Sequence, residues 1–279
     1  TPGELQTTAL ADIGGLLREL LLLARADDLD DARVHLTLRL LVGHALDDDR
    51  ATTTLVLKGL QRRSSGGAGR GPLPTGEDRR ALWAEAGVLR EELAAPVLVL
   101  NLPADGDSLC DQTLRAHART GEPARLTLRQ LVRQPPRLTP LRAATVHVCE
   151  NPAVVSAAAE QLAERSRPLV CVEGQPSSAA QTLLRRLREA GAELTHHGDF
   201  DWGGLRIANL LSRRYGAGPW RFHTGAYLAA PGGPTLSGRP VAAVWDRDLA
   251  PAMRARGIAV HEEQVLDDLL ADLDLGTRR

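Results

Sequence analysis

Two aspartates separated by a single residue, Asp199 and Asp201, are the first candidates for chemistry in this sequence. They follow a short β-prone run and precede a glycine pair and a helical pattern. Side chains two positions apart in an extended strand point the same way, so both carboxylates would project into one space. Two like charges that close are costly without a proton or a cation, and a hard divalent ion takes oxygen ligands. The alternative interpretation is a pair of loop aspartates that cap the following helix.

The order of elements predicts which other acids meet this pair. From residue 143 onward strand-like runs alternate with helical patterns, which is typical of a parallel sheet with right-handed crossovers. In such sheets the working groups collect at the carboxyl ends of the strands. Glu150 and Glu173 each directly follow a strand, and we therefore expect them at the same edge as the aspartates. The expected strands are 145–149, 168–172, 193–197, 220–223, 241–245 and 258–260. Helices are expected at 152–165, 204–214, 249–256 and 264–273, and a turn followed by a helix at 173–191.

The first half of the chain has a different pattern. It predicts helices at 10–63, 77–93 and 107–120, a loop at 64–76, and strands at 96–102 and 126–132. The prolines Pro135 and Pro136 then interrupt the pattern. We predict a mainly helical region with a winged-helix module over residues 1–139, followed by an α/β domain over residues 140–279. The fold class expected for the chain is therefore α/β.

Composition excludes several classes of protein. The 279 residues carry a formal net charge of −1, which excludes a protein that coats nucleic acid by bulk attraction. The apolar runs are too short to span a bilayer. The three cysteines lack the spacing of a zinc site, and we expect buried thiols in a cytoplasmic protein. The sequence starts at Thr1 and its one methionine is Met253, so we expect the natural N-terminus to lie upstream.

Several motifs together resemble a known domain. CENPAVVSAAAEQL, LVCVEGQPSSAAQTLLRRL and HGDFDWGGLRIANLL occur in this order. A glutamate after the first strand and a D-x-D after the third are the signature of the Toprim domain. The sequence looks most like the Toprim domain of the topoisomerase VI A subunit and the nuclease subunit of Wadjet-type bacterial plasmid-defence systems. The likeness extends over residues 90 to 270 and includes the motifs LNLP, LRQLVRQPP and HEE.

The resemblance implies a site and an activity. Glu150, Asp199 and Asp201 would bind Mg²⁺, with Mn²⁺ as a substitute, and would cleave double-stranded DNA. Subunits of a condensin-like complex of SMC and kleisin type would be the partners. A double-strand cut requires two active sites, which a homodimer would provide. Topoisomerase VI relatives cleave with a tyrosine that precedes the Toprim domain, whereas Tyr215 and Tyr227 follow the D-x-D. This departure favours hydrolysis by a metal-activated water.

Residues around the three acids have two interpretations each. We assign DNA contact to Arg206, near a helix start that favours anions, and to His197. Their alternatives are an ion-paired arginine and a strand histidine bonded to backbone. Glu173 stands where topoisomerase relatives often carry a lysine, and is either an extra ligand or a loop acid. The segment His261, Glu262 and Glu263 either completes the metal site or starts a helix, while Trp202 is expected to pack and Asp246 and Asp248 to cap a helix.

Two other functions compete with a nuclease. A non-catalytic Toprim-like scaffold could dock on DNA or on the SMC complex, but it gains nothing from adjacent unpaired carboxylates. The second competing function is that of a phosphatase or a nucleotide-binding enzyme on a doubly wound sheet. Haloacid-dehalogenase-type phosphatases carry their D-x-D after the first strand, and the chain has no G-x-G-x-x-G for a dinucleotide.

Overall fold

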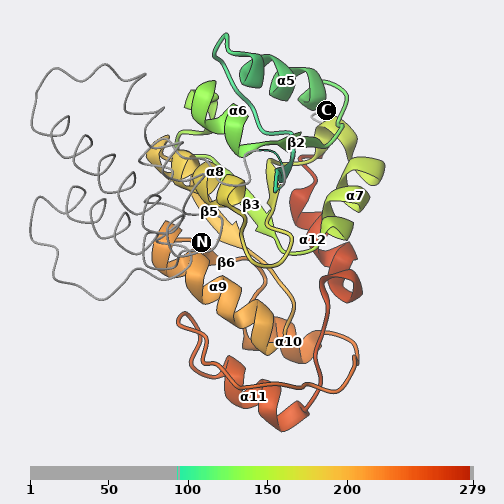
Figure 1. Ribbon diagram of the computed structural model, residues 1–279. Helices are drawn as coiled ribbons and strands as arrows, with labels where there is room; N and C mark the ends of the chain where they lie inside the picture. The colour runs from blue at the N-terminus through green and yellow to red at the C-terminus, as the bar shows by residue number, and fades with distance from the viewer. Residues whose placement is uncertain (1–92, 94, 277–279) are drawn as a thin grey trace, which may run out of the picture. The chain divides into compact units, whose positions relative to one another are not determined.

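In the computed structural model the chain divides into two compact units, Thr1–Arg90 and Glu91–Arg279. Residues 93 and 95–276 are described here, and they belong to the second unit (Figure 1). The predicted helices at 10–63 and 77–93 and the predicted loop at 64–76 lie outside the described residues, apart from residue 93. None of the described helices has the length and apolar character that crossing a membrane requires.

A six-stranded sheet forms the centre of the second unit, with the strand order β2-β1-β4-β3-β5-β6. Its strands are β1 (Val97–Leu100), β2 (Ala124–Leu126), β3 (Thr145–Cys149), β4 (Leu169–Cys171), β5 (Glu193–His196) and β6 (Gly218–Pro219). The pairs β3–β4, β3–β5 and β5–β6 are parallel, while β1 is antiparallel to both β2 and β4. The sheet is therefore mostly parallel, and the predicted α/β fold class is confirmed.

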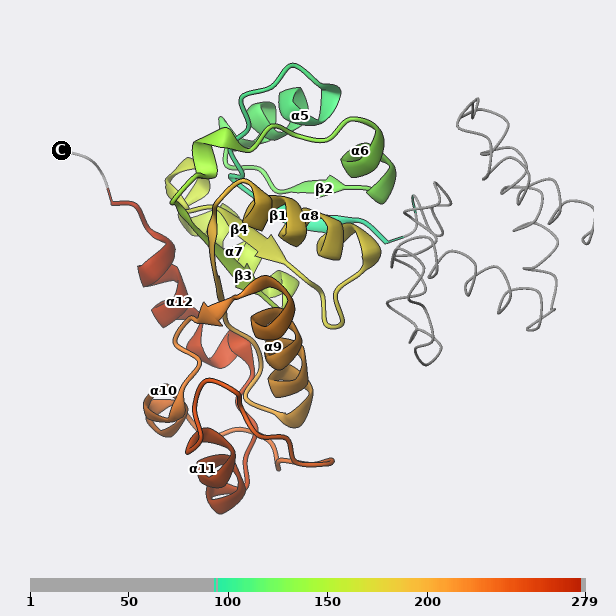
Figure 2. The ribbon, with the colours of Figure 1, turned by 90° about the vertical axis from the view of Figure 1, so that its left-hand side faces the viewer.

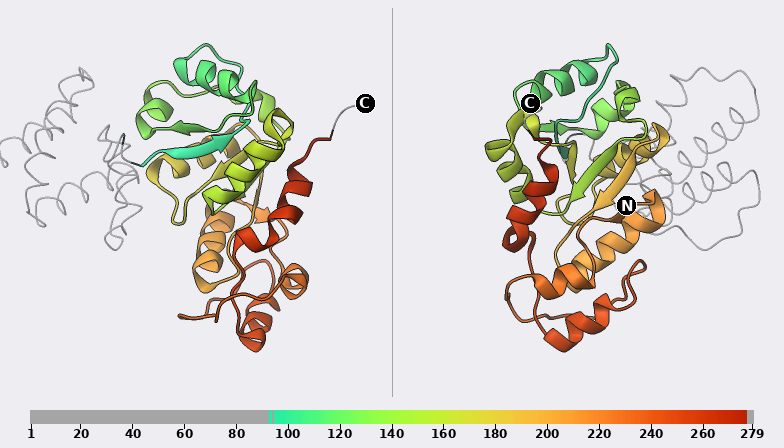
Figure 3. Two further views of the ribbon diagram at one scale, coloured as in Figure 1. Left: turned by 90° about the vertical axis from the view of Figure 1, so that its right-hand side faces the viewer. Right: turned by 180° about the vertical axis from the view of Figure 1, so that it is seen from behind.

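Helices flank this sheet. They are α5 (Leu109–Ala118), α6 (Leu128–Arg133), α7 (Pro152–Gln161), α8 (Ser178–Glu189), α9 (Trp202–Tyr215), α10 (Thr224–Ala229), α11 (Leu249–Arg256) and α12 (Leu266–Leu273), with short 3₁₀ turns η1 (Thr139–Leu141), η2 (Ala163–Arg165) and η3 (Glu262–Val265). The chain passes from β3 to β4 on one side and then back across β3 to β5. Right-handed crossovers then require α7 and α8 on opposite faces. Figures 2 and 3 show α7 with α12 on one face and α8 with α9 on the other.

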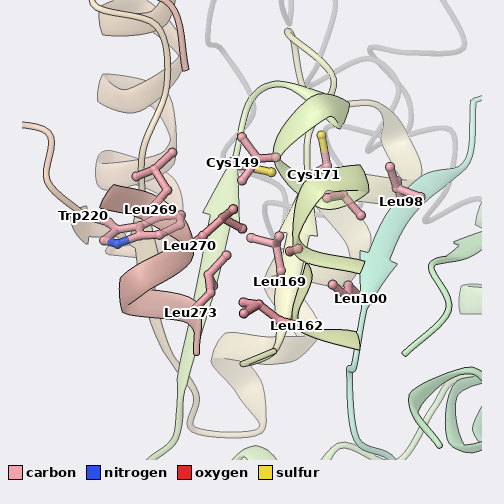
Figure 4. Packing of buried hydrophobic residues seen from close by; sticks show 13 residues of the cluster. Leu98, Leu100, Cys149, Leu162, Leu169, Cys171, Trp220, Leu269, Leu270 and Leu273 are labelled. Atoms are coloured by element: carbon pink, nitrogen blue, oxygen red, sulfur yellow. The ribbon is translucent and has the colours of Figure 1, made fainter. Parts of the chain in front are cut away.

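Two apolar clusters hold these layers together. The first packs α7 and α12 against β1, β3 and β4, and it includes Cys149, Cys171 and Trp220 (Figure 4). The second gathers most of the few aromatic rings, among them Phe200 and Phe222, between α9, α10 and α11. All three cysteines are free and buried, as the sequence predicted.

The segment predicted as a strand at 126–132 is instead mostly a helix. Only Leu126 belongs to β2, and α6 begins two residues later. The Thr127 side chain accepts a hydrogen bond from the Gln130 N–H, and the Gln130 side chain caps Thr127 in return. This capping box starts a helix in which Leu128 and Leu131 share a buried face. The winged-helix interpretation used this strand, so it loses its support within the described residues.

Three further strand predictions are wrong. Residues 220–223 and 241–245 form no ladder, and 258–260 makes only the isolated bridges Phe200↔Val260 and Thr235↔Ile258. In the second of these segments the Asn209 side chain, on α9, bonds to the Ala242 carbonyl and the Val244 N–H. A helix side chain thus satisfies backbone groups that a neighbouring strand would otherwise satisfy.

The domain boundary also lies earlier than the sequence suggested. β1 and β2 precede the predicted boundary at 139/140, yet both pair within the same sheet as β3 to β6. The double proline falls between α6 and η1, inside the second unit. Proline marks a loop here because it cannot continue a helix or a ladder, and a loop need not separate domains.

Candidate metal centre at the carboxyl edge of the sheet

Glu150 and the aspartate pair meet because β3 and β5 are parallel neighbours. Val148 lies opposite His196 in this pair, and both strands end at the same edge of the sheet. Glu150 is therefore beside Gly198, and a Cβ atom added to Gly198 would lie only 2.9 Å from Glu150 Oε2. The crossovers leave β3 and β5 in opposite directions, which opens the sheet edge for ligands at this point. The sequence analysis predicted this convergence, and the structure shows it.

The Glu150 carboxylate is held in a position that disfavours its charge. Its Oε2 atom is buried and has no hydrogen-bond partner among the described residues. Burial, followed by the charges of Asp199 and Asp201, raises the pKa of Glu150 to about 7. A cation between these carboxylates would offset the cost of burying the Glu150 charge, because it would bind the free oxygen. It would also cancel the repulsion between the carboxylates.

Asp199 and Asp201 have different local roles. The Asp199 Oδ1 atom accepts the Glu262 N–H at 2.9 Å, and its Oδ2 lies 3.2 Å from His261 Nδ1. Burial raises the pKa of Asp199 above its ordinary value. Asp201 is the N-cap of α9, and its Oδ1 accepts the Gly204 N–H at 2.7 Å. Thus Asp201 does cap the helix, and its hydrogen bond through Oδ1 limits the directions in which its Oδ2 atom can point.

The segment at 261–263 brings a third element to the same edge. The Glu262 side chain is fully buried, and its Oε2 accepts the backbone N–H groups of Glu150 (3.0 Å) and Asn151 (2.5 Å). Burial raises the pKa of Glu262 well above its ordinary value. Glu263 accepts a hydrogen bond from the Asn151 side chain at 2.6 Å. Both sequence interpretations of this segment are therefore partly met: it starts η3, and it also joins the acidic edge.

The donor set fits a divalent cation. Ligand atoms of Asp199, His261 and Glu263 lie within 4.8 Å of one another. Two further carboxylate oxygens at this edge, Glu150 Oε2 and Glu262 Oε1, are buried without a partner in the described part of the chain. Carboxylate oxygens suit Mg²⁺ and Mn²⁺, and an imidazole ligand is also compatible with a transition metal. The sequence left open whether His261 and Glu263 complete the metal site, and the signal for it was the H-E-E run directly after a β-prone segment.

Glu173 is placed apart from this set. It follows β4 with a left-handed backbone (φ 54°), and its carboxylate forms two hydrogen bonds to Arg125, at 2.8 and 2.9 Å. The Arg125 side chain thus occupies both carboxylate oxygens. Of the two interpretations of Glu173, the loop acid is the one that this geometry favours.

His197 is not placed for the DNA contact that the sequence assigned to it. It is 1% exposed, and its Nδ1 lies 2.9 Å from the Trp220 carbonyl oxygen, among the rings of Phe200 and Phe222. Burial lowers the pKa of His197 to about 4, so the imidazole is neutral near pH 7. The alternative, a histidine bonded to backbone, describes it correctly, although His197 lies one residue past the end of β5.

The other flanking residues can also be placed. Arg206 is exposed, and its Nη2 donates to the Arg239 carbonyl at 2.8 Å. Trp202 is buried, which confirms the packing role predicted for it. Asp246 accepts the Thr224 N–H and hydroxyl at the start of α10, and Asp248 precedes α11. The predicted capping role is met in part: Asp246 accepts hydrogen bonds at a helix start, whereas Asp248 is the N-cap residue of α11 without a side-chain cap hydrogen bond.

Two family models match parts of this chain, and the gap between the two matches lies inside the second unit. A family model described as "Protein of unknown function N-terminus (DUF3323)" matches residues 37–104. A search of curated proteins found no significant match. A second family model, described as "Protein of unknown function C-terminus (DUF2399)", matches residues 124–273, which include every acid of the candidate metal centre. Because this match covers more than half of the 279 residues, the chain belongs to the DUF2399 family.

Proposed function

We propose that this protein is a Mg²⁺-dependent endonuclease that hydrolyses phosphodiester bonds of double-stranded DNA. The observation that carries the proposal is the meeting of Glu150, Asp199 and Asp201 at adjacent strand ends, with an unpartnered buried oxygen on Glu150. The arrangement is the one that the resemblance to the Toprim domain implies. Unpaired buried carboxylates reduce stability, so they are costly to retain in a scaffold with no use for them.

The residues of the chain would act mainly by positioning. Glu150, Asp199 and Asp201 would hold Mg²⁺, with His261 and Glu263 on the open side of the site. A bound divalent cation lowers the pKa of its water and stabilises charge on phosphate oxygens. Glu262 keeps the Glu150 backbone in place, and its own N–H fixes the Asp199 carboxylate. The helix cap at Asp201 fixes the third acid. A carboxylate cluster held by backbone groups needs little rearrangement during the reaction.

Tyr227 is not placed to act as a nucleophile in the described geometry. Tyr227 is buried, and its hydroxyl donates a hydrogen bond to the Ile258 carbonyl at 2.7 Å. Burial raises the pKa of Tyr227, which makes its phenolate less available. We therefore propose hydrolysis by water. On the strength of the Wadjet resemblance, we further propose that the protein is the cleaving subunit of an SMC-type plasmid-defence complex.

Cleavage of supercoiled plasmid tests the proposal. The wild type, Glu150→Gln and Asp199→Asn are compared in Mg²⁺ and in chelator, with Glu189→Gln as a matched control that removes one exposed carboxylate on α8. We expect Mg²⁺-dependent nicking or linearisation by the wild type and the control, and a loss of at least about 100-fold in the two site variants. Equal cleavage by Glu150→Gln would refute the proposed role of the acids.

A further inference from the structure

Residues 231–248 form an irregular segment between α10 and α11, which we call the strap. Irregular segments longer than about 12–15 residues are uncommon in compact domains, and most of them are functional or disordered. This segment has a defined path. On one side the Leu236 N–H donates to the Gly257 carbonyl, and the Pro234 carbonyl accepts the Ala259 N–H. The strap is therefore an ordered loop, the class of element that commonly carries binding residues.

Helix α9 holds the other side of the strap with its own side chains. Arg206 donates to the Arg239 carbonyl at 2.8 Å. Asn209 donates to the Ala242 carbonyl at 2.8 Å and accepts the Val244 N–H at 3.0 Å. Asn209 is only 7% exposed, so both ends of a buried amide are used to fix this loop. A buried amide without these partners would be destabilising, which ties the shape of the strap to α9.

The tip of the strap lies against Trp202, the residue that follows Asp201 of the candidate metal centre. Gly238 has a left-handed backbone (φ 96°), and a Cβ atom added to it would lie 3.7 Å from Trp202 Cδ1. Trp202 is the first residue of α9 and directly follows Asp201, one of the three acids. The tip residues 237–240 are exposed, and their sequence, Ser-Gly-Arg-Pro, contains no large apolar side chain. This composition fits a polar or charged partner better than an apolar protein surface.

Arg239 is the charged residue of this tip. Its side chain makes no hydrogen bond or ion pair in the described part of the chain, while the guanidinium of Arg206 is engaged with the strap itself. The acids of the metal centre repel a phosphate chain, so cations beside them are needed to hold it. An arginine fork matches the geometry of a phosphate. We propose that the strap presents Arg239 to a backbone phosphate of a DNA duplex whose scissile bond lies at the acidic edge. This inference rests on the proposed function and names its substrate contact.

Equilibrium binding to a short DNA duplex tests this contact. The full chain is titrated at low ionic strength with Ca²⁺ in place of Mg²⁺, so that binding is measured separately from cleavage, and the titration is repeated over a series of salt concentrations. The variants are Arg239→Ala and Arg239→Lys, and Arg254→Ala on α11 is the control with the same loss of charge. We expect Arg239→Ala to weaken binding several-fold and to reduce the slope of log K against log salt by about one. We expect the lysine variant to keep the slope and Arg254→Ala to match the wild type.

The outcomes separate this inference from the proposed function. An unchanged slope in Arg239→Ala, an equal loss in Arg254→Ala, or no binding by the wild type at low salt would overturn the contact. If the wild type binds DNA through Arg239 but fails to cleave it in Mg²⁺, the contact stands and the nuclease proposal fails. Thermal unfolding of each variant is the control for the fold. Because the substituted residues are exposed, we expect each melting temperature to match that of the wild type.

Discussion

Glu262 shows how a single side chain can organise a site without being exposed in it. Its carboxylate accepts two backbone N–H groups at the end of β3, and its own N–H donates to Asp199 after β5. It therefore joins three segments that lie far apart in the sequence. Hydrogen bonds to a carboxylate are stronger than neutral ones, and removal of the acceptor leaves buried donors unpaired.

Substitution Glu262→Ala should therefore destabilise the protein strongly. Two buried N–H groups lose their acceptor and a small cavity forms, so we expect a loss of about 3–5 kcal/mol in the free energy of unfolding. Urea denaturation in chelator measures it. The neighbouring Glu263 is exposed, and its hydrogen bond within the described residues is to the Asn151 side chain, so Glu263→Ala should cost less than about 1 kcal/mol. Similar losses in the two variants would contradict the bracing role.

The raised pKa of Glu150 predicts how stability depends on pH in the absence of metal. Its pKa is about 7 in the folded protein and near its ordinary value of 4.5 in the unfolded chain, so the folded state binds more protons between these values. Stability is then lost as pH rises through 7. Burial lowers the pKa of His196 to about 3 and that of His197 to about 4, which has the opposite effect, but only below about pH 6.5.

We therefore expect deprotonation of Glu150 to lower the free energy of unfolding by roughly 1 kcal/mol between pH 6.5 and 8.5 in chelator, with burial of Asp199 and Glu262 contributing in the same direction. Glu150→Gln should flatten this slope and should be more stable than the wild type at the alkaline end. Saturating Mg²⁺ should restore stability to the wild type at that pH. A wild type whose stability rises over this range would contradict the arrangement of acids.

At the scale of elements, the D-x-D loop and α9 form one tightly packed unit. A Cβ atom added to Gly204 would lie 2.1 Å from the Asp199 carbonyl oxygen, a distance that no side chain tolerates. Gly204 also donates its N–H to Asp201, so the start of the helix and the positions of both aspartates are determined together. The glycine is needed for close approach of two backbones, and its helical position does not require unusual dihedral angles.

Gly204→Ala should therefore displace the loop that carries the two aspartates. We expect a loss of about 3 kcal/mol or more in stability, together with weaker Mg²⁺ binding measured by calorimetry. Gly225→Ala is the matched control, since it is also a helical glycine and the nearest atoms to its added Cβ belong to the His223 ring, at 3.4 Å. This is an ordinary van der Waals distance, and we expect a change below about 1 kcal/mol. Equal tolerance of both substitutions would show that the loop is looser than the packing indicates.

At the scale of the whole molecule, charge limits what the chain can do alone. The net charge is −1, and the candidate site adds a local excess of carboxylates. Few phosphate contacts give weak and salt-sensitive DNA affinity. Weak affinity of the chain alone is what the proposed delivery of DNA by partner subunits would overcome.

We accordingly predict that the isolated chain cleaves plasmid poorly at physiological salt and that the SMC-type partner subunits raise the rate by at least about 100-fold. The reason is the weak phosphate affinity expected of a chain with this charge. Plasmid cleavage with and without the partners, over a range of salt concentrations, measures the effect. Strong, salt-resistant cleavage by the chain alone would contradict it.

Local signals in the sequence were sufficient for the central alternation and for the three acids. Asn151 and Pro152 start α7 as a cap and first helical residue, and β-branched runs mark β3 and β4. These signals act within a few residues, so they are visible in the sequence. Once the strands are parallel, the carboxyl-edge rule brings Glu150 to the D-x-D without further information.

Long-range contacts decided the rest, and they leave little trace in the local sequence. Whether residues 95–139 join the sheet depends on the pairing of β1 with β4, and the return of His261 to the site depends on the bridge between Phe200 and Val260. The strap keeps its shape through Asn209 rather than through a ladder of its own. A backbone group needs only some partner, and a side chain distant in sequence serves as well as a strand. The tertiary structure therefore determined which acids, histidines and arginines surround the site.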